Sequence, residues 1–311
     1  MNPFPYSLDN KRYHTYNYYL KTRYDGKVAK VIIDGGFTCP NRDGSKGVGG
    51  CIFCSNSGSG DANKSLKDDI LNQYINNKAM MDRKWDNKLY IPYFQSFSNT
   101  YGSLEKMQRM LEPFIKMDEV AEISLATRAD CLNDDILKYL CEVNKTKHIN
   151  IELGLQSSND NTAKKINRCH SFVDFKEGLD KLNKYNLAAC IHIMNGLPFE
   201  TLEDMYKTIE DISHLKFFGI KIHMLHVLKN TKLGDMYLNK QFPIITREEY
   251  IKLVVRQLEI LPQNVVIERL TGDPIKEDLI APLWVLNKTT ILNDIDKLML
   301  KENTWQGKYY R

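Results

Sequence analysis

The sequence predicts an α/β fold, a full or partial (β/α) barrel of the TIM type with parallel strands. The chain has 311 residues, 42% of them hydrophobic, which is enough for one large core. Short apolar runs alternate with longer amphipathic segments, a pattern typical of a parallel sheet covered by helices. The spacing of roughly 35 residues per strand–helix unit fits a barrel better than a short doubly wound sheet.

Seven apolar runs are predicted as strands: residues 28–33, 89–94, 122–126, 150–155, 188–194, 220–227 and 265–269. The amphipathic segments between them are predicted as helices: residues 66–82, 104–117, 134–143, 172–185, 201–215 and 247–261. The last helix should begin after Thr246, because Glu249, three residues later, completes a capping box. An eighth unit could come from the C-terminal region, although that region is mainly helical in pattern.

The chain is expected to form one barrel with two flanking parts. Residues 1–26 are rich in aromatic side chains and are expected to form an N-terminal cap, residues 27–270 the barrel, and residues 271–311 an extension packed on it. No run approaches eighteen apolar residues, so no membrane span is expected. The net charge of +4 is compatible with an anionic partner but does not by itself indicate one.

The seven cysteines are too few, and odd in number, for a disulfide scaffold. The N-terminus lacks the apolar segment of a secretory signal, so we expect a cytoplasmic protein with reduced thiols. Three of the thiols, Cys39, Cys51 and Cys54, follow the first predicted strand on a glycine-rich loop. Because barrel enzymes carry their active sites where strands end, these three thiols should lie at the active edge.

Three kinds of chemistry compete for this loop. A [4Fe-4S] cluster normally takes four thiolates, so three would leave one iron with an open coordination position. A zinc site would need a fourth ligand, which only Cys169 with His170 could supply, through tertiary proximity. A thioredoxin-like pair would place the CxxC at the start of a helix, whereas Cys54 leads into "SNSGSG".

The loop resembles that of the radical S-adenosylmethionine (SAM) superfamily. The commonest spacing there is CxxxCxxC, and the wider C-x11-C-x2-C gap of this chain resembles the elongator-protein-3-like branch and, more closely, the YtqA/YhcC-type family. Further motifs carry the resemblance, each near a predicted strand end: "YFQSFSNTY", "ATRADCL", "ELGLQSSND", "INRCH", "HIMNGLPFET", "KIHMLHVLKNT", "ERLTGDP" and "TWQGK".

The resemblance implies an enzyme whose [4Fe-4S] cluster, held by Cys39, Cys51 and Cys54, cleaves SAM to a 5′-deoxyadenosyl radical. It also implies which strand ends bind SAM. The methionine amine would meet the segment that replaces the usual glycine-glycine-acid motif, and the carboxylate and adenine would meet two later segments. The residues implied for the methionine amine are Gln95, Ser96, Ser98, Asn99 and Thr100. Those implied for the carboxylate are Gln156, Ser157 and Arg168, and those for the adenine are Gly196 and Leu197. Arg128, at the third strand end, is also implied.

His192 is either a core histidine or, if it faces inward, a contact of the ribose. Lys221 and His223 share one face of the sixth predicted strand, because side chains alternate along a strand. They would either suit an anionic substrate or form plain salt bridges.

Two substrates are compatible with the resemblance: a wobble uridine of tRNA, or a small metabolite such as a tetrapyrrole. Either would require a small electron-donor protein of the flavodoxin or ferredoxin type. A non-enzymatic iron–sulfur or zinc module that binds a partner is the third alternative.

Overall fold

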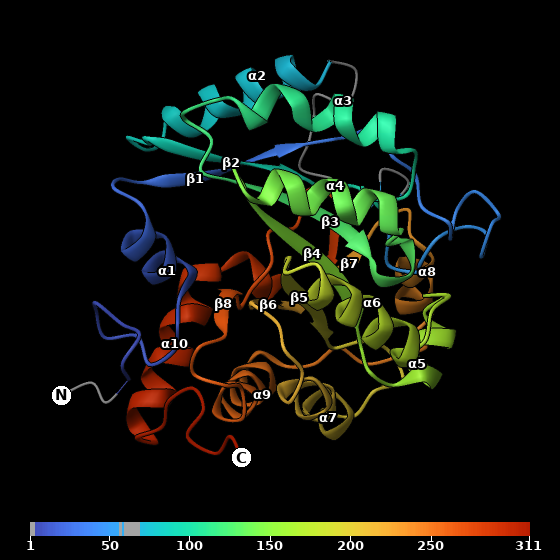
Figure 1. Cartoon of the computed structure of the whole chain (residues 1–311). Coiled ribbons are helices and arrows are strands. Elements are labelled where there is room, and N and C mark those ends of the chain that lie inside the picture. The colour runs from blue at the N-terminus through green and yellow to red at the C-terminus, as the bar shows by residue number, and fades with distance from the viewer. Residues whose placement is uncertain (1–3, 56–57, 59–68) are drawn as a thin grey trace.

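Seven parallel strands form a curled sheet, a half-barrel with helices along its outer face (Figure 1). This computed structural model describes residues 4–55, 58 and 69–311. The strand order is β1-β2-β3-β4-β5-β6-β8. The structure therefore confirms the predicted class, a partial (β/α) barrel of the TIM type.

The strands and main helices lie close to the predicted runs. The strands are β1 (Val28–Ile33), β2 (Leu89–Phe94), β3 (Glu122–Arg128), β4 (His148–Gln156), β5 (Ala188–Asn195), β6 (Gly219–Met224) and β8 (Val266–Arg269). The helices that follow them are α2 (Ile70–Asp82), α3 (Leu104–Ile115), α4 (Asp134–Asn144), α6 (Phe172–Lys184), α7 (Leu202–Ser213) and α9 (Arg247–Glu259). The start of the helix predicted over 66–82 lies outside the described residues, at 66–68.

Several shorter elements complete the chain. The helices are α1 (Tyr16–Arg23), α5 (Asp160–Lys165), α8 (Lys232–Leu238) and α10 (Lys288–Lys301), with short 3-10 turns η1 (Ala129–Cys131) and η2 (Leu283–Leu286). The C-terminal region forms η2 and α10, and within the described ranges it adds no eighth strand to the main sheet.

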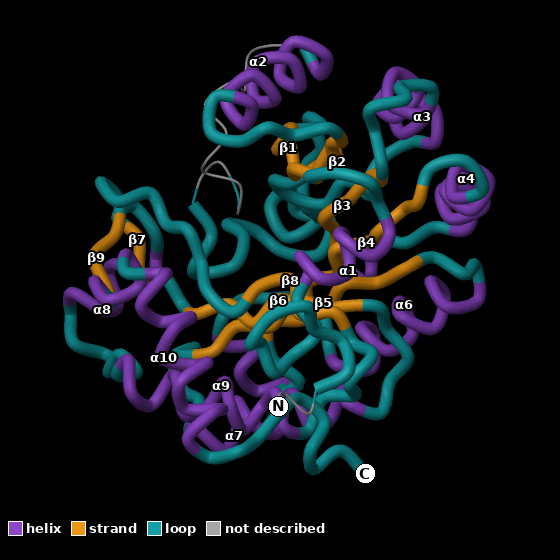
Figure 2. The backbone as a smooth tube through the Cα atoms, turned by 90° about the vertical axis from the view of Figure 1, so that its left-hand side faces the viewer, coloured by secondary structure: helices purple, strands orange, loops and turns teal. Residues whose placement is uncertain are grey.

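The prediction of a single strand over 220–227 is wrong. The chain leaves the main sheet after Met224, and β7 (Val227–Leu228) pairs antiparallel with β9 (Leu279–Ala281). Figure 2 shows these two short strands beside α8 at one side of the molecule. A continuous apolar run does not reveal where a strand changes partner, because the partner lies about fifty residues away in the chain.

The strands are buried on both faces, as expected for a parallel sheet covered by helices. The seven central residues of β4 are all buried. A second, smaller apolar cluster joins Ile52 of the cysteine loop to Ile166, Leu197 and Leu233. It links the loop to the ends of α5 and β5 and to α8.

The N-terminal segment lies against the free edge of β8. Thr15 pairs in parallel with Ile267, whose backbone N–H donates to the carbonyl oxygen of His14 at 2.7 Å. This contact shields an edge that would otherwise present unpaired backbone groups. In the described part of the chain, no helix is long and apolar enough to cross a membrane.

Candidate functional site

Cys39, Cys51 and Cys54 converge on one pocket at the C-terminal edge of the half-barrel. The same pocket is lined by five other predicted site residues: Ser98, Arg128, Gln156, Arg168 and His192. His192 forms part of its wall from β5. Residues far apart in the sequence therefore share a cavity because parallel strands end at the same edge.

The cysteine loop is tied down by two asparagines. The side chain of Asn41 donates to the carbonyl oxygen of Asn167 and to the Cys51 sulfur, 3.6 Å away. Asn167 in turn donates to the carbonyl oxygen of Gly50 at 2.7 Å. Gly50 has φ +74°, and a Cβ there would lie 2.9 Å from the Arg42 guanidinium, so the tight loop needs glycine at this position.

Two of the three thiols lie close enough to share a hydrogen bond. The Cys54 thiol donates to Cys51 and, together with Arg168 and Arg128, lowers the pKa of Cys51 to about 5. The same bond, with burial, raises the pKa of Cys54 well above its ordinary value. Thiolates are the form that binds metals, and cationic surroundings stabilise them.

Arg128 organises the edge between two strand ends. Its Nε and one Nη each donate to the Asp130 carboxylate at 2.9 Å, and the other Nη donates to the carbonyl oxygen of Arg168 at 2.8 Å. Arg168 donates to the carbonyl oxygen of Gly154 at 2.6 Å. These bonds hold both guanidinium groups beside the cysteines.

Gln156 ends β4 in a left-handed conformation, with φ +76°. Its side-chain oxygen is buried and has no hydrogen-bond partner in the described part of the chain. A buried polar atom without a partner costs stability, so its presence in a pocket points to a missing ligand. Gly154, two residues earlier on β4, leaves room for the Arg168 guanidinium, which would lie 2.8 Å from a Cβ at this position.

The remaining predicted residues lie outside the pocket lining. Thr100 donates to the carbonyl oxygen of Cys131 at 2.8 Å, and the Asn99 amide bonds to three backbone carbonyls around the end of β2. Ser157 donates to Glu200. Also outside the lining are Gln95, Ser96, Gly196 and Leu197.

Several lining residues were missed from the sequence. They are Arg42, Phe53, Phe97 and Glu152, among others. Arg42 lies over the Phe97 ring, 5.1 Å from its centroid, and bonds to the carbonyl oxygen of Ser55. Glu152 had a visible signal, because it is the one charged residue in the apolar run of β4.

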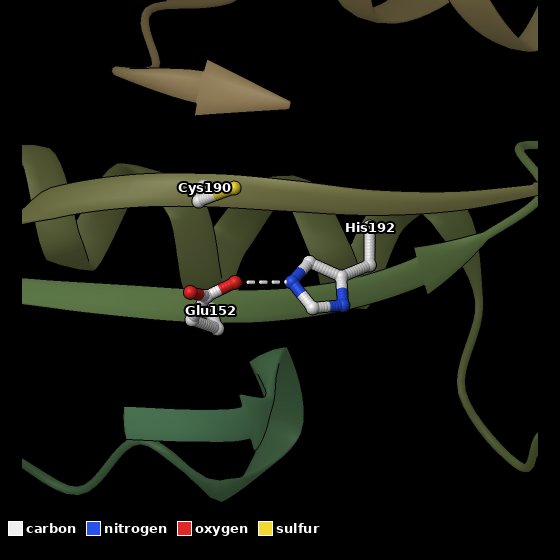
Figure 3. A group of neighbouring side chains, drawn as sticks. All are labelled: Glu152, Cys190 and His192. Carbon is white, nitrogen blue, oxygen red and sulfur yellow. Dashed lines mark hydrogen bonds and ion pairs between the residues drawn. The ribbon is translucent and has the colours of Figure 1, made fainter. Parts of the chain in front are cut away.

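A buried network of charges extends into the barrel interior from Glu152. Its carboxylate accepts from Lys30 on β1 at 2.7 Å, from Lys221 on β6, and from His192 Nε2 at 2.5 Å (Figure 3). Glu268 on β8 also accepts from Lys30, at 2.6 Å. Lys221 was expected either to suit an anionic substrate or to form a salt bridge, and in the structure it forms a salt bridge.

The fold and the family comparisons together define the class of protein. The Radical SAM superfamily model matches residues 39–212, and the Radical SAM C-terminal domain model matches residues 218–301. The first match covers more than half of the chain and begins at Cys39. The protein is an enzyme of the radical SAM type, a class that uses a [4Fe-4S] cluster and SAM.

Two relatives match along nearly their whole length. Bacillus subtilis YtqA is 43% identical over 310 residues, which cover 100% of this chain and 96% of YtqA. Escherichia coli YhcC is 30% identical over 289 residues, covering 93% and 92% of the two chains. The chain belongs to the radical SAM superfamily and, within it, to the family of YtqA and YhcC.

More distant similarities involve the elongator branch. The solved structure of archaeal Elp3 from Methanocaldococcus infernus superposes with a TM-score of 0.67 at 16% identity, over 91% of this chain and 65% of that one. This similarity supports the fold. The tRNA uridine(34) acetyltransferase of the same organism is 25% identical over 177 residues, which span 54% of this chain and 33% of the acetyltransferase.

Proposed function

We propose that Cys39, Cys51 and Cys54 hold a [4Fe-4S] cluster through three of its irons and that SAM binds in the adjoining pocket. The observation that carries this proposal is the convergence of the three thiols with Gln156 and Arg168 on one cavity. Neither Cys169 nor His170, the fourth ligand that zinc would need, is among the residues lining it. Three thiolates without a fourth suit a cluster that keeps one open coordination position.

The residues present fit such a cofactor. The unpartnered Gln156 oxygen is an acceptor, so it suits the methionine amine of SAM rather than the carboxylate that the resemblance implied for this residue. The Arg168 guanidinium suits the methionine carboxylate, which an Arg fork binds well. Phe53 and Phe97 add apolar walls that exclude water. When bound, the cluster supplies the electron that cleaves SAM to a 5′-deoxyadenosyl radical. In this proposal a flavodoxin- or ferredoxin-type protein delivers that electron.

Replacing any one of the three cysteines by alanine tests the ligand set. After anaerobic reconstitution, each variant should lose the visible absorption of the cluster and release no 5′-deoxyadenosine from SAM with dithionite. Cys190→Ala is the matched control: this thiol is fully buried on β5 and is not among the residues lining the pocket. It should keep the cluster and lose about 1 kcal/mol of stability from packing. Full iron content in the Cys39, Cys51 and Cys54 variants would refute the assignment.

We further propose that the substrate is a uridine of tRNA. Support comes from the similarity to the tRNA uridine(34) acetyltransferase, a similarity that spans about half of this chain. The positive net charge of this chain also supports it. The deciding measurement is nucleoside mass spectrometry of tRNA from a strain that lacks the gene. A modified uridine should disappear and return on complementation. An unchanged nucleoside profile would instead favour a small metabolite as the substrate.

A further inference from the structure

Polar side chains also line the barrel interior before the ends of β4 and β5. Glu152 precedes Gln156 by four residues on β4, and His192 precedes Gly196 by four residues on β5. In the register of the two strands, Glu152 pairs with Cys190 and His192 with Gly154, so the Glu152 backbone lies two residues deeper than that of His192. His192 lies about one residue below the level of Gln156, which pairs with Ile193. Glu152 and His192 nevertheless line the same pocket as the cysteines. The pocket therefore runs from the rim into the barrel.

The charges of the buried network are balanced internally. Lys30 and Lys221 face Glu152 and Glu268, and the other Glu268 oxygen accepts from Asn150 at 2.9 Å. All four ionic side chains are at least four-fifths buried. An anionic substrate would have to draw a lysine away from a buried carboxylate, which would leave that carboxylate uncompensated. The network therefore disfavours a phosphate or carboxylate group.

A metal ion is also disfavoured, although Glu152, Cys190 and His192 place ligand atoms within 4.8 Å of one another. Figure 3 shows the three side chains on β4 and β5. Both oxygens of Glu152 are already engaged by ammonium groups, Oε1 by Lys30 and Oε2 by Lys221. A cation would have to displace them from the same carboxylate.

The network determines which ring nitrogen of His192 carries a proton. Burial alone would raise the pKa of Glu152, but Lys221 and Lys30 hold it well below its ordinary value, so the carboxylate only accepts hydrogen bonds. The nitrogen that faces it, Nε2, must then carry the proton. Burial and the nearby Lys221 lower the pKa of His192, so the ring is neutral and Nδ1 has a free lone pair.

Nδ1 points away from Glu152 (Figure 3), and the ring that carries it lines the pocket. The neighbouring titratable groups do not change the protonation state of the His192 ring. His223 on β6 lies with its ring centroid 5.2 Å away, and its pKa is held well below the ordinary value, first by burial. It is therefore neutral as well.

We propose that His192 Nδ1 accepts a hydrogen bond from a neutral hydroxyl or N–H group of the substrate, with Glu152 as the positioning residue that keeps this nitrogen unprotonated. The inference rests on the proposed function and deepens it: a uridine offers such donors in its ring N–H and its ribose hydroxyl. The comparison of SAM-only and tRNA-dependent rates below distinguishes this role from a contact with the ribose of SAM.

The tautomer is measured directly in the full-length protein, without activity. Long-range proton–nitrogen NMR of ¹⁵N-histidine-labelled protein, with the His192 signals assigned through His192→Asn, should give the neutral Nε2–H form at pH 7. Glu152→Gln should add a second tautomer, because an amide can donate as well as accept. An Nδ1–H ring or an imidazolium at pH 7 in the parent protein would overturn the proposal. That measurement decides the point even if Glu152→Gln does not fold.

The role toward substrate is tested with tRNA from the deletion strain. The reconstituted enzyme is given SAM and dithionite, and 5′-deoxyadenosine is measured with and without this tRNA. His192→Leu removes the acceptor, whereas His192→Asn keeps an oxygen near the position of Nδ1. We expect the tRNA-dependent rate of the Leu variant to fall about tenfold further than its SAM-only rate, and the Asn variant to recover most of that loss.

Two outcomes of this assay would overturn the proposal: equal losses in the Leu and Asn variants, or a SAM-only rate that falls as far as the tRNA-dependent rate. If the parent enzyme cleaves SAM but tRNA has no effect, the tRNA function fails. The NMR measurement then still decides the protonation of His192 on its own.

Discussion

Two glutamines of this chain, the buried Gln257 and the half-buried Gln156, differ in how their side chains are paired. Gln257 on α9 is fully paired: it exchanges hydrogen bonds with Asn195 at 2.8 and 3.0 Å and donates to the carbonyl oxygen of Met205 at 2.9 Å. The Gln156 side-chain oxygen has no partner in the described ranges. The paired side chain of Gln257 stabilises the fold. The unpartnered oxygen of Gln156 is typical of a group that binds a ligand.

The contrast predicts opposite effects of alanine substitution. Gln156→Ala should change the free energy of unfolding by less than about 1 kcal/mol, because no hydrogen bond of its side-chain oxygen is lost. It should raise the Kd of SAM several-fold. Gln257→Ala should cost about 2–3 kcal/mol, because its partners remain buried and unpaired. Urea unfolding and SAM titration of the reconstituted protein measure both quantities. A large stability loss in Gln156→Ala with unchanged SAM affinity would contradict its assignment.

Glu200 makes the stability of the protein depend on pH. Burial raises the pKa of this carboxyl to about 7, against an ordinary value near 4.5 in the unfolded chain. Between these two values the folded state binds more protons than the unfolded state, so the free energy of unfolding should fall as the pH rises from about 5 to 7. Glu200→Gln should remove this part of the slope. Urea unfolding at several pH values tests it, and identical slopes in the two proteins would contradict the prediction.

At the scale of elements, α6 packs unusually close to the turn that follows β3. A Cβ at Gly178 would lie 2.6 Å from the carbonyl oxygen of Ala129 and 2.7 Å from its Cβ. Ala129 follows Arg128 directly, so this helix supports the edge of the site from behind. The close contact explains a glycine in the middle of a helix, where it costs intrinsic stability.

Gly178→Ala should therefore destabilise the protein, although alanine favours a helix by up to about 1 kcal/mol over glycine. The added methyl group would push α6 away from η1 and shift Arg128, so SAM affinity should fall as well. Glu177→Ala, an exposed position on the same helix, is the matched control and should change neither quantity. Thermal unfolding and SAM titration measure the two effects. A gain of stability in Gly178→Ala would show that the contact relaxes freely.

Local patterns predicted most elements well. β1 and β2 have the predicted bounds, and the capping box of Thr246 and Glu249 begins α9. The elements missed from the sequence are short: α1, α5, α8 and the β7–β9 pair. Runs of two to eight residues carry little periodicity, and β7 and β9 are strands only because distant segments pair with each other.

At the scale of the whole molecule, the two ends of the chain meet beside β8. Gln306 is fully buried, and its side chain accepts from the backbone N–H of His14 at 2.8 Å. The same side chain donates to the carbonyl oxygens of Pro262 and Val265, at 2.6 and 2.9 Å. One amide thus joins the N-terminal segment, the loop before β8 and the C-terminal segment. The division into a cap, a barrel and an extension stays a prediction.

Gln306→Ala should cost about 2–4 kcal/mol, because it leaves several buried backbone groups without partners. The loss should be accompanied by faster hydrogen exchange at Ile267, whose N–H bonds to His14. Glu302→Ala, an exposed position nearby in the sequence, is the control. Hydrogen exchange followed by mass spectrometry tests the link between the ends. Unchanged exchange at β8 in a destabilised variant would show that the N-terminal segment is held by other contacts.

The sequence by itself determined the class of a full or partial (β/α) barrel, the position of the three thiols at the end of the first strand, and the family. These properties depend on periodicity and motifs that are local in the chain. Only the tertiary structure decided which side chains meet inside the barrel. Lys30, Glu152, Lys221 and Glu268 come from four strands, and Lys30 lies 122 and 238 residues from its two partners. The residues next to them in the sequence do not reveal these ion pairs, because the curl of the sheet brings the four strands together.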